Sequence, residues 1–161
     1  MPSVYRTLHL TLVLCLLVGD CFAADWTPDQ RVVLEVVAAY TEASHQRDLN
    51  AYLSFWHADF LGWHNGDDSP TDHDARSNGL KHYFDTTKSL SYEFEPIAVQ
   101  VLSNGDAAIV HYKLRNVLEV RETGEKIRGI SYWTDYLVRE KDRWLLISDH
   151  GGSVPGQDKM N

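Results

Sequence analysis

The last third of the chain contains four long segments that have the character of β-strands, and this feature most constrains the fold. They span residues 91–103, 106–121, 126–140 and 143–151. The first is rich in β-branched and aromatic residues and ends at Asn104-Gly105, a strong signal for a tight hairpin turn. Because strands of this length twist strongly, the sequence predicts a strongly curved antiparallel sheet.

The first half of the chain supplies helices that cover one face of this sheet. Thr27 is a helix cap, Pro28 suits the first helical position, and Gln30 completes a capping box. Apolar residues then recur at helical spacing to about residue 46. Two further helices are predicted at residues 48–55 and 75–88, with a short strand at residues 59–64 between them. This order predicts one α+β domain over residues 24–161, a cone-like curved antiparallel sheet wrapped around three N-terminal helices.

The first 23 residues have the pattern of a secretory signal peptide. Arg6 precedes an apolar run, residues 8–18, that is too short to cross a bilayer, and Cys21-Phe22-Ala23 resembles a cleavage site. We expect cleavage after Ala23, a periplasmic or secreted protein, and no membrane association afterwards. A lipid-anchored protein has a small residue directly before the modified cysteine, but Asp20 precedes Cys21, which argues against a lipid anchor. Both cysteines lie in this leader, so the mature domain has no disulfide and no cysteine-bound metal.

The charge of the chain argues against one class of partner. The formal net charge is −8, and no run of lysines or arginines follows a path that could track a phosphate backbone. We therefore expect no nucleic-acid partner.

Alternation along the strands indicates which side chains point into the curve of the sheet. In the second long strand the apolar set shares one face, and His111 and Arg115 share the opposite, outer face. The third strand is apolar on both faces, so Tyr132 and Tyr136 would form an exposed patch, which predicts a homodimer through the outer sheet face. In the fourth strand, alternation from Trp144 places His150 beside the mouth of the cavity that the curved sheet leaves open.

Three stretches resemble the nuclear transport factor 2-like or SnoaL-like superfamily. They are the helix pair at residues 39–55 with Arg47-Asp48-Leu49 at its junction, the run Asn104-Gly105-Asp106-Ala107-Ala108, and the ending Arg143-Trp144-Leu145 with Ile147 and His150. The last two are similar to the association domain of calcium/calmodulin-dependent kinase. The resemblance runs from residue 29 to about residue 155 and implies the cone-like fold. This scaffold hosts isomerases, cyclases, dehydratases, transport factors and assembly domains.

The resemblance to ketosteroid isomerases, which share this fold, implies an acid–base site. An ungapped alignment on Asp48 places Tyr40 at the position of that family's tyrosine and His64 at the position of its carboxylate base. Asp135 falls near the second acid, and the kinase association domain implies that it faces the cavity. His64 would move a proton, and Tyr40 with a protonated Asp135 would donate hydrogen bonds to a developing enolate. Scytalone dehydratase uses histidines and tyrosines on this scaffold, so an isomerase and a lyase both remain open.

Four further residues are candidates for substrate binding, and each has a plain structural alternative. Trp63 and Trp133 fit a cavity wall, where they would stack on a ring or simply pack. Tyr112 and His150 are candidate partners for a buried Asp135, which needs hydrogen bonds. Tyr40 on an apolar helix face also fits a core tyrosine, and His64 fits a turn start.

The acidic loop at residues 67–74 raises the question of a metal. It lacks the histidine spacing of a metal site, and acidic loops commonly cap helices, so we predict neither a metal nor a cofactor.

Taken together, the residues and the resemblance predict a secreted SnoaL-like domain with an aromatic-lined pocket for a small, ring-containing molecule. The catalytic hypothesis is proton transfer or dehydration next to a carbonyl. The alternatives are a non-catalytic ligand-binding module and a dimeric assembly module.

Overall fold

The computed structural model describes residues 25–154 and 159–160. The predicted signal peptide at residues 1–23 lies outside the described residues, so cleavage and export remain predictions. None of the helices within the described part of the chain is long and apolar enough to cross a membrane.

Three helices form where capping residues begin them. In α1 (Pro28–Gln46), Thr27 accepts a hydrogen bond from the Gln30 amide and donates its own amide to the Gln30 side chain, which confirms the capping box. The helix α2 (Leu49–Leu53) begins at the Asp48 cap and is shorter than predicted. The helix α3 (His73–Thr86) begins two residues earlier than predicted, because Asp72 caps it by accepting from the Ala75 amide.

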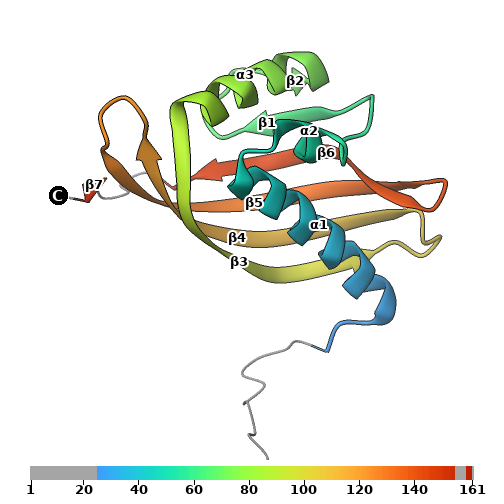
Figure 1. Ribbon diagram of the computed structural model, residues 1–161. Coiled ribbons are helices and arrows are strands. Elements are labelled where there is room, and N and C mark those ends of the chain that lie inside the picture. The colour runs from blue at the N-terminus through green and yellow to red at the C-terminus, as the bar shows by residue number, and fades with distance from the viewer. Residues whose placement is uncertain (1–24, 155–158, 161) are drawn as a thin grey trace, which may run out of the picture.

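The strands form one sheet in the order β2-β1-β6-β5-β4-β3, with β7 beside β5 (Figure 1). Their bounds are β1 Leu61–His64, β2 Thr71–Asp72, β3 Thr87–Val101, β4 Ala107–Val120, β5 Lys126–Glu140, β6 Arg143–Ser153 and β7 Lys159–Met160. The pairing of β1 with β6 is parallel and the other described pairs are antiparallel. The four long strands appear where the sequence places them, although β3 begins directly after α3, four residues before its predicted start.

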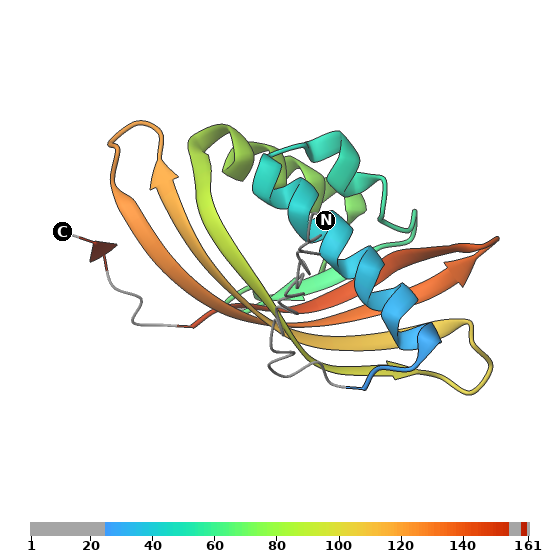
Figure 2. The same cartoon turned by 60° about the horizontal axis from the view of Figure 1, so that its bottom comes forward.

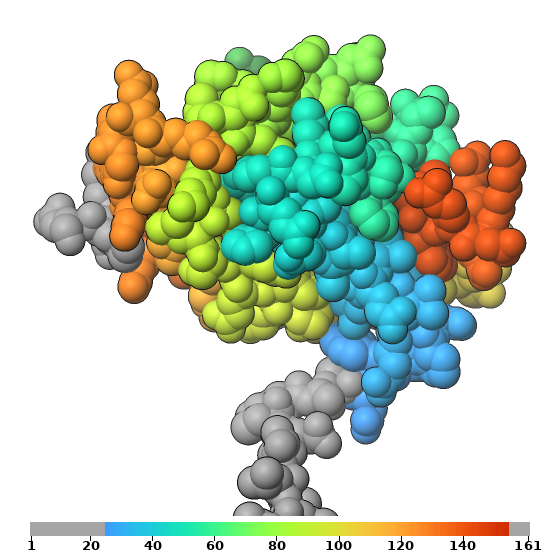
Figure 3. Space-filling model, in the orientation of Figure 1, coloured from blue at the N-terminus to red at the C-terminus, as the bar shows by residue number. Residues whose placement is uncertain are grey.

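The sheet curves around the helices, which confirms the α+β cone (Figure 2). Helix α1 lies across the concave face, and Val33, Val37 and Tyr40 pack there against Val110 and Leu137. Each fully buried aliphatic side chain of this kind stabilises the fold by roughly 1.5–3 kcal/mol. Seen from the helix side, α1, α2 and α3 cover much of the sheet (Figure 3).

A β-bulge interrupts β6 and changes which side chains face the helices. Tyr136 pairs with Ser148, but Leu137 pairs with Leu146, so Ile147 is an extra residue in β6. Because side chains alternate along a strand, one extra residue inverts the facing of everything beyond it. The expectation that His150 lies on the same face as Trp144 is therefore wrong, and Asp149 is buried in its place.

Candidate functional site

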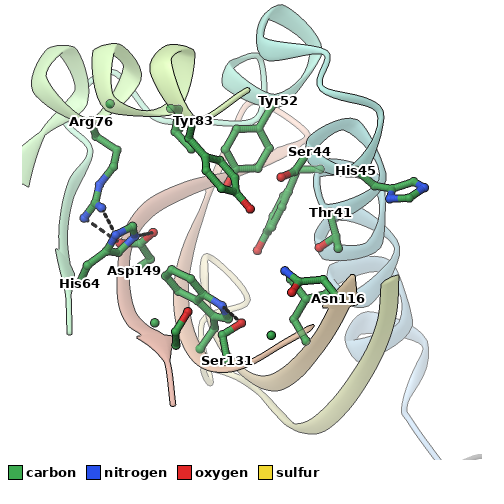
Figure 4. A pocket seen from close by; sticks show the side chains of 18 of the residues that line it. Thr41, Ser44, His45, Tyr52, His64, Arg76, Tyr83, Asn116, Ser131 and Asp149 are labelled. Atoms are coloured by element: carbon green, nitrogen blue, oxygen red, sulfur yellow. Dashed lines mark hydrogen bonds and ion pairs between the residues drawn. The ribbon is translucent and has the colours of Figure 1, made fainter. Parts of the chain in front are cut away.

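A cavity of about 730 Å³ lies between the concave face of the sheet and the three helices. Aromatic side chains form much of its wall: Tyr40, Tyr52, Trp56, Tyr83, Tyr92, Tyr112 and Trp133. Figure 4 shows Tyr52 and Tyr83 reaching into the cavity from the helices, while Asn116 and Ser131 face them from the sheet. The polar groups of the wall gather at two centres.

The first polar centre is the carboxyl group of Asp135, which is 1% exposed. The Tyr40 hydroxyl donates a hydrogen bond to Asp135 Oδ2, and Tyr112 is a second hydrogen-bond donor to this carboxyl group. Burial raises the pKa of Asp135 from its ordinary value of 3.8 to about 7. The two tyrosine hydrogen bonds oppose this increase, and the negative charge of Asp149 adds to it.

The tyrosines around Asp135 remain protonated at neutral pH. Burial, followed by the charge of Asp135, raises the pKa of both Tyr40 and Tyr112 well above its ordinary value of 10. The carboxyl group is therefore the member of this centre that gains or loses a proton near neutral pH.

The second polar centre joins His64, Arg76 and Asp149 (Figure 4). Arg76 Nη1 donates a hydrogen bond to His64 Nδ1. His64 Nε2 lies 3.7 Å from Asp149 Oδ2. Because arginine only donates, we assign His64 Nδ1 as the acceptor, which leaves the proton of the neutral ring on Nε2, facing the Asp149 carboxylate. Both ring nitrogens of His64 are thus engaged.

The backbone brings the two centres together on neighbouring strands. Asp135 and Asp149 are directly opposite each other in the β5–β6 register, and His64 pairs with Gly151 across β1 and β6. Like charges directly opposite on adjacent strands repel each other, which favours a proton on one of the two carboxyl groups. The ring of His64 also contacts Trp133, at a centroid distance of 4.9 Å.

Gly62 makes room for this arrangement. A Cβ atom at this position would lie 2.1 Å from Asp149 Oδ1 and 2.6 Å from the Phe60 ring. The close approach of β1 to the Asp149 side chain therefore requires glycine.

Five of the seven predicted site residues line the cavity. They are Tyr40, His64, Asp135, Tyr112 and Trp133. Their roles in binding or catalysis stay predictions.

The prediction that Trp63 and His150 line the cavity is wrong. Trp63 is 46% exposed, and its indole N–H donates to the Asp67 carbonyl oxygen. It precedes His64 in a strand, so the two side chains must point to opposite faces. His150 lies on the outer face because of the bulge in β6.

Sequence reasoning missed two residues of the second centre. Arg76 lies at helical spacing from Leu80 and Tyr83, which also line the cavity, so the amphipathic pattern of α3 carried a usable signal. The sequence carries no such signal for Asp149, because strand alternation without the bulge places its side chain on the outer face.

Among the described residues, no three histidine, cysteine, aspartate or glutamate side chains are grouped so that they could hold a metal ion.

Comparison with solved structures supports the fold at low sequence identity. A ketosteroid isomerase-like protein from Erwinia carotovora atroseptica superposes with a TM-score of 0.70 at 16% identity, covering 80% of this chain and 98% of that chain. A calcium/calmodulin-dependent protein kinase II association domain-like protein from Xanthomonas campestris gives 0.63 at 15% identity, covering 78% and 88%. A hexachlorocyclohexane dehydrochlorinase, LinA type 2, gives 0.62 at 10% identity, covering 83% and 92%.

Sequence comparison identifies the family. No curated protein matches the sequence significantly. The profile of the SnoaL-like domain, however, matches residues 33–156. This range extends from the first turns of α1 through β6 and so includes both polar centres. The chain therefore belongs to the SnoaL-like domain family.

Proposed function

We propose that this domain binds a small, ring-containing molecule in its cavity and, as an exported protein, does so outside the cytoplasm. A volume of about 730 Å³ is within the range of small-molecule sites. The aromatic wall offers faces on which a ring can stack, and the two polar centres offer hydrogen bonds that fix its orientation.

The reaction that this site supports best is proton transfer next to a carbonyl. In this proposal the ligand's carbonyl oxygen accepts a hydrogen bond from the pair formed by Tyr40 and protonated Asp135. A base removes a proton from the adjacent carbon, and the C–H electron pair becomes the enolate double bond. The proton then returns to another carbon, which is isomerisation, or leaves with a hydroxyl group as water. The observation that carries the proposal is the buried Asp135, whose pKa of about 7 keeps it a donor up to neutral pH.

His64 is the candidate base, and it must release its contact with Arg76 before it can take a proton. Arg76 occupies His64 Nδ1. Once that contact opens, Nδ1 can take the proton from the ligand's carbon. The Nε2–H then stays on the ring and donates a hydrogen bond to the Asp149 carboxylate, which stabilises the imidazolium. His64 and Asp149 thus have the arrangement of a histidine base with a carboxylate that orients its ring.

Deuterium exchange tests the reaction without knowledge of the product. A panel of cyclic ketones is incubated with the protein in D₂O, and loss of the α-proton signals is followed by NMR. We expect exchange by the wild-type domain, and a decrease of about 10²–10⁴-fold for His64→Ala and for Asp135→Asn. His150→Ala is the matched control, because this histidine lies on the outer face.

The outcomes separate the catalytic proposal from its alternatives. Ketones that bind and raise thermal stability without exchange would make the domain a binding module. An unchanged exchange rate in His64→Ala would exclude His64 as the base, and faster exchange above pH 7 would exclude protonated Asp135 as the donor.

We also propose that the outer sheet face forms a homodimer. Tyr132 is 55% exposed and Tyr136 is 40% exposed on β5, with Ile130 on the same strand also exposed. Such a patch on a sheet commonly marks an interface. Sedimentation should give a dimer for the wild-type protein and a monomer for Tyr136→Asp, and a monomeric wild-type protein would refute the interface.

A further inference from the structure

Arg76 is a cavity-lining arginine with unused hydrogen-bonding capacity. It is 8% exposed, and Nη1 is committed to His64. Its Nε and Nη2 atoms are buried and have no hydrogen-bond partner within the described residues. The nearest carboxylate oxygens, on Asp67 and Asp149, lie 3.9 Å from Nη2, beyond hydrogen-bond distance. Unpaired buried donors are costly, so this side of the guanidinium is suited to a further acceptor.

An unused acceptor lies beside these donors. Asp149 Oδ1 is buried and lacks a hydrogen-bond partner in residues 25–154 and 159–160. It is the atom 3.9 Å from Arg76 Nη2. A group that both accepts and donates would satisfy the two sides at once.

The charges here select against an anion. Arg76 carries one positive charge, and Asp67 and Asp149 carry one negative charge each within 4 Å of it. With neutral His64 the cluster is net negative, so a carboxylate or phosphate would meet repulsion from two carboxylates. A neutral group meets none.

Access to these atoms depends on α3. Arg76 and Asp149 line the cavity, but their unpaired atoms are shielded from solvent, so a ligand can reach these atoms only if the first turn of α3 shifts. Arg76 and Phe84 are the only buried residues of this helix. In the first turn, His73 also contacts the ring of the buried Trp56, at a centroid distance of 5.6 Å. Such a movement therefore breaks few packing contacts.

We propose that Arg76 and Asp149 together bind a neutral ligand group with an acceptor oxygen and a donor side by side, such as a ring compound with a primary amide or with adjacent carbonyl and hydroxyl groups. The oxygen of this group, which is separate from the carbonyl proposed to bind at Asp135, accepts from Arg76, and its N–H or O–H donates to Asp149 Oδ1. The inference rests on the proposed function and names its substrate class.

Three naphthalene compounds that differ in one substituent test this class. They are 2-naphthamide, with an acceptor and a donor, 2-acetonaphthone, with an acceptor only, and 2-naphthoate, an anion. Calorimetric titration should show the amide binding the wild-type protein about tenfold more tightly than the ketone, the effect of one hydrogen bond to a charged group. The naphthoate should bind most weakly of the three.

Variants then assign the preference to residues. Asp149→Ala should reduce the amide-to-ketone ratio to about one, and Arg76→Met should weaken both neutral compounds. Arg115→Met is the matched control, because Arg115 pairs with Glu93 and Glu95 and does not line the cavity. If Arg76→Met does not fold, Arg76→Lys replaces it, since it keeps the charge and loses the planar fork.

Each outcome decides between the two proposals. Equal binding of amide and ketone, tighter binding of naphthoate, or equal effects of Arg76→Met and Arg115→Met would overturn this inference and leave the proposed cavity function intact. If none of the three binds the wild-type protein, the proposal of a ring-binding cavity fails, and this inference fails with it.

Discussion

The two polar centres of the cavity are built in opposite ways. At Asp135 the carboxyl group is enclosed by two tyrosine donors, and burial sets its affinity for a proton. At Arg76 the charged groups lie close together but leave donors and an acceptor unpaired. A closed hydrogen-bond network holds a proton in a defined place, whereas an open one can accept a ligand. We therefore infer that the first centre holds a proton for donation to a ligand, whereas the second centre recognises the ligand and supplies the candidate base, His64.

The largest expected effect concerns the proton on Asp135. Its pKa in the folded protein is about 7, above the ordinary value of 3.8. The folded state therefore retains this proton between pH 4 and pH 7 while the unfolded state loses it. This contribution to stability is fully present below about pH 4, is lost progressively as the pH rises, and is gone just above pH 7. Asp135→Asn should remove the loss, and the difference in unfolding free energy between variant and wild type should grow by about 4 kcal/mol from pH 4 to pH 8. Urea denaturation across this range measures it, and a constant difference would show that Asp135 does not hold the proton.

The next effect concerns the open centre. Arg76→Met leaves the Asp149 carboxylate buried with His64 as its remaining partner, and it should lower the unfolding free energy by about 3 kcal/mol. Arg115→Met on the outer face should cost less than about 1 kcal/mol. Urea denaturation at pH 7 compares them. Equal losses would mean that the Arg76 centre is solvated and is not the buried cluster described above.

A smaller effect tests the backbone beneath the open centre. Gly62→Ala places a Cβ atom against Asp149 Oδ1 and Phe60 and should cost roughly 2 kcal/mol. Gly79→Ala in α3 meets open space and should stabilise the protein by up to about 1 kcal/mol, because alanine favours a helix. Thermal melting should give a lower melting temperature for Gly62→Ala and a higher one for Gly79→Ala. An unchanged melting temperature for Gly62→Ala would show that β1 does not press on Asp149.

The smallest effect returns to the closed centre. Tyr40→Phe removes one donor to Asp135 and should cost about 1 kcal/mol. Because this hydrogen bond lowers the pKa of Asp135, its loss should move the carboxyl titration to higher pH. Carbon-13 NMR of the side-chain carboxyl group follows the shift. A shift to lower pH would contradict the assignment of Tyr40 as donor.

The same contrast explains what the sequence could predict. The closed centre depends on regular structure: Tyr40 lies on the apolar face of a helix, and Tyr112 lies on the apolar face of an unbroken strand. Alternation left the facing of Asp135 open, because its strand is apolar on both faces, and the resemblance to the kinase association domain placed it in the cavity. The open centre depends on exceptions. The bulge at Ile147 turns Asp149 toward the cavity and His150 to the outer face, and no residue type in β6 predicts a bulge at that position. The spacing of Arg76 matches the buried side of α3, but charged residues in helices are usually exposed, so the residue type argues against a buried position.

The facing carboxyl groups of Asp135 and Asp149 also connect occupancy of the cavity to the proton balance of the solution. A ligand whose carbonyl oxygen accepts a hydrogen bond from protonated Asp135, as proposed above, stabilises the protonated form, so binding slightly above neutral pH takes up hydrogen ions from the medium. The heat of binding will then depend on the ionisation enthalpy of the buffer, and the apparent affinity will fall as the solution becomes more alkaline. Occupancy of the cavity at a fixed ligand concentration will therefore depend on the pH of the surroundings.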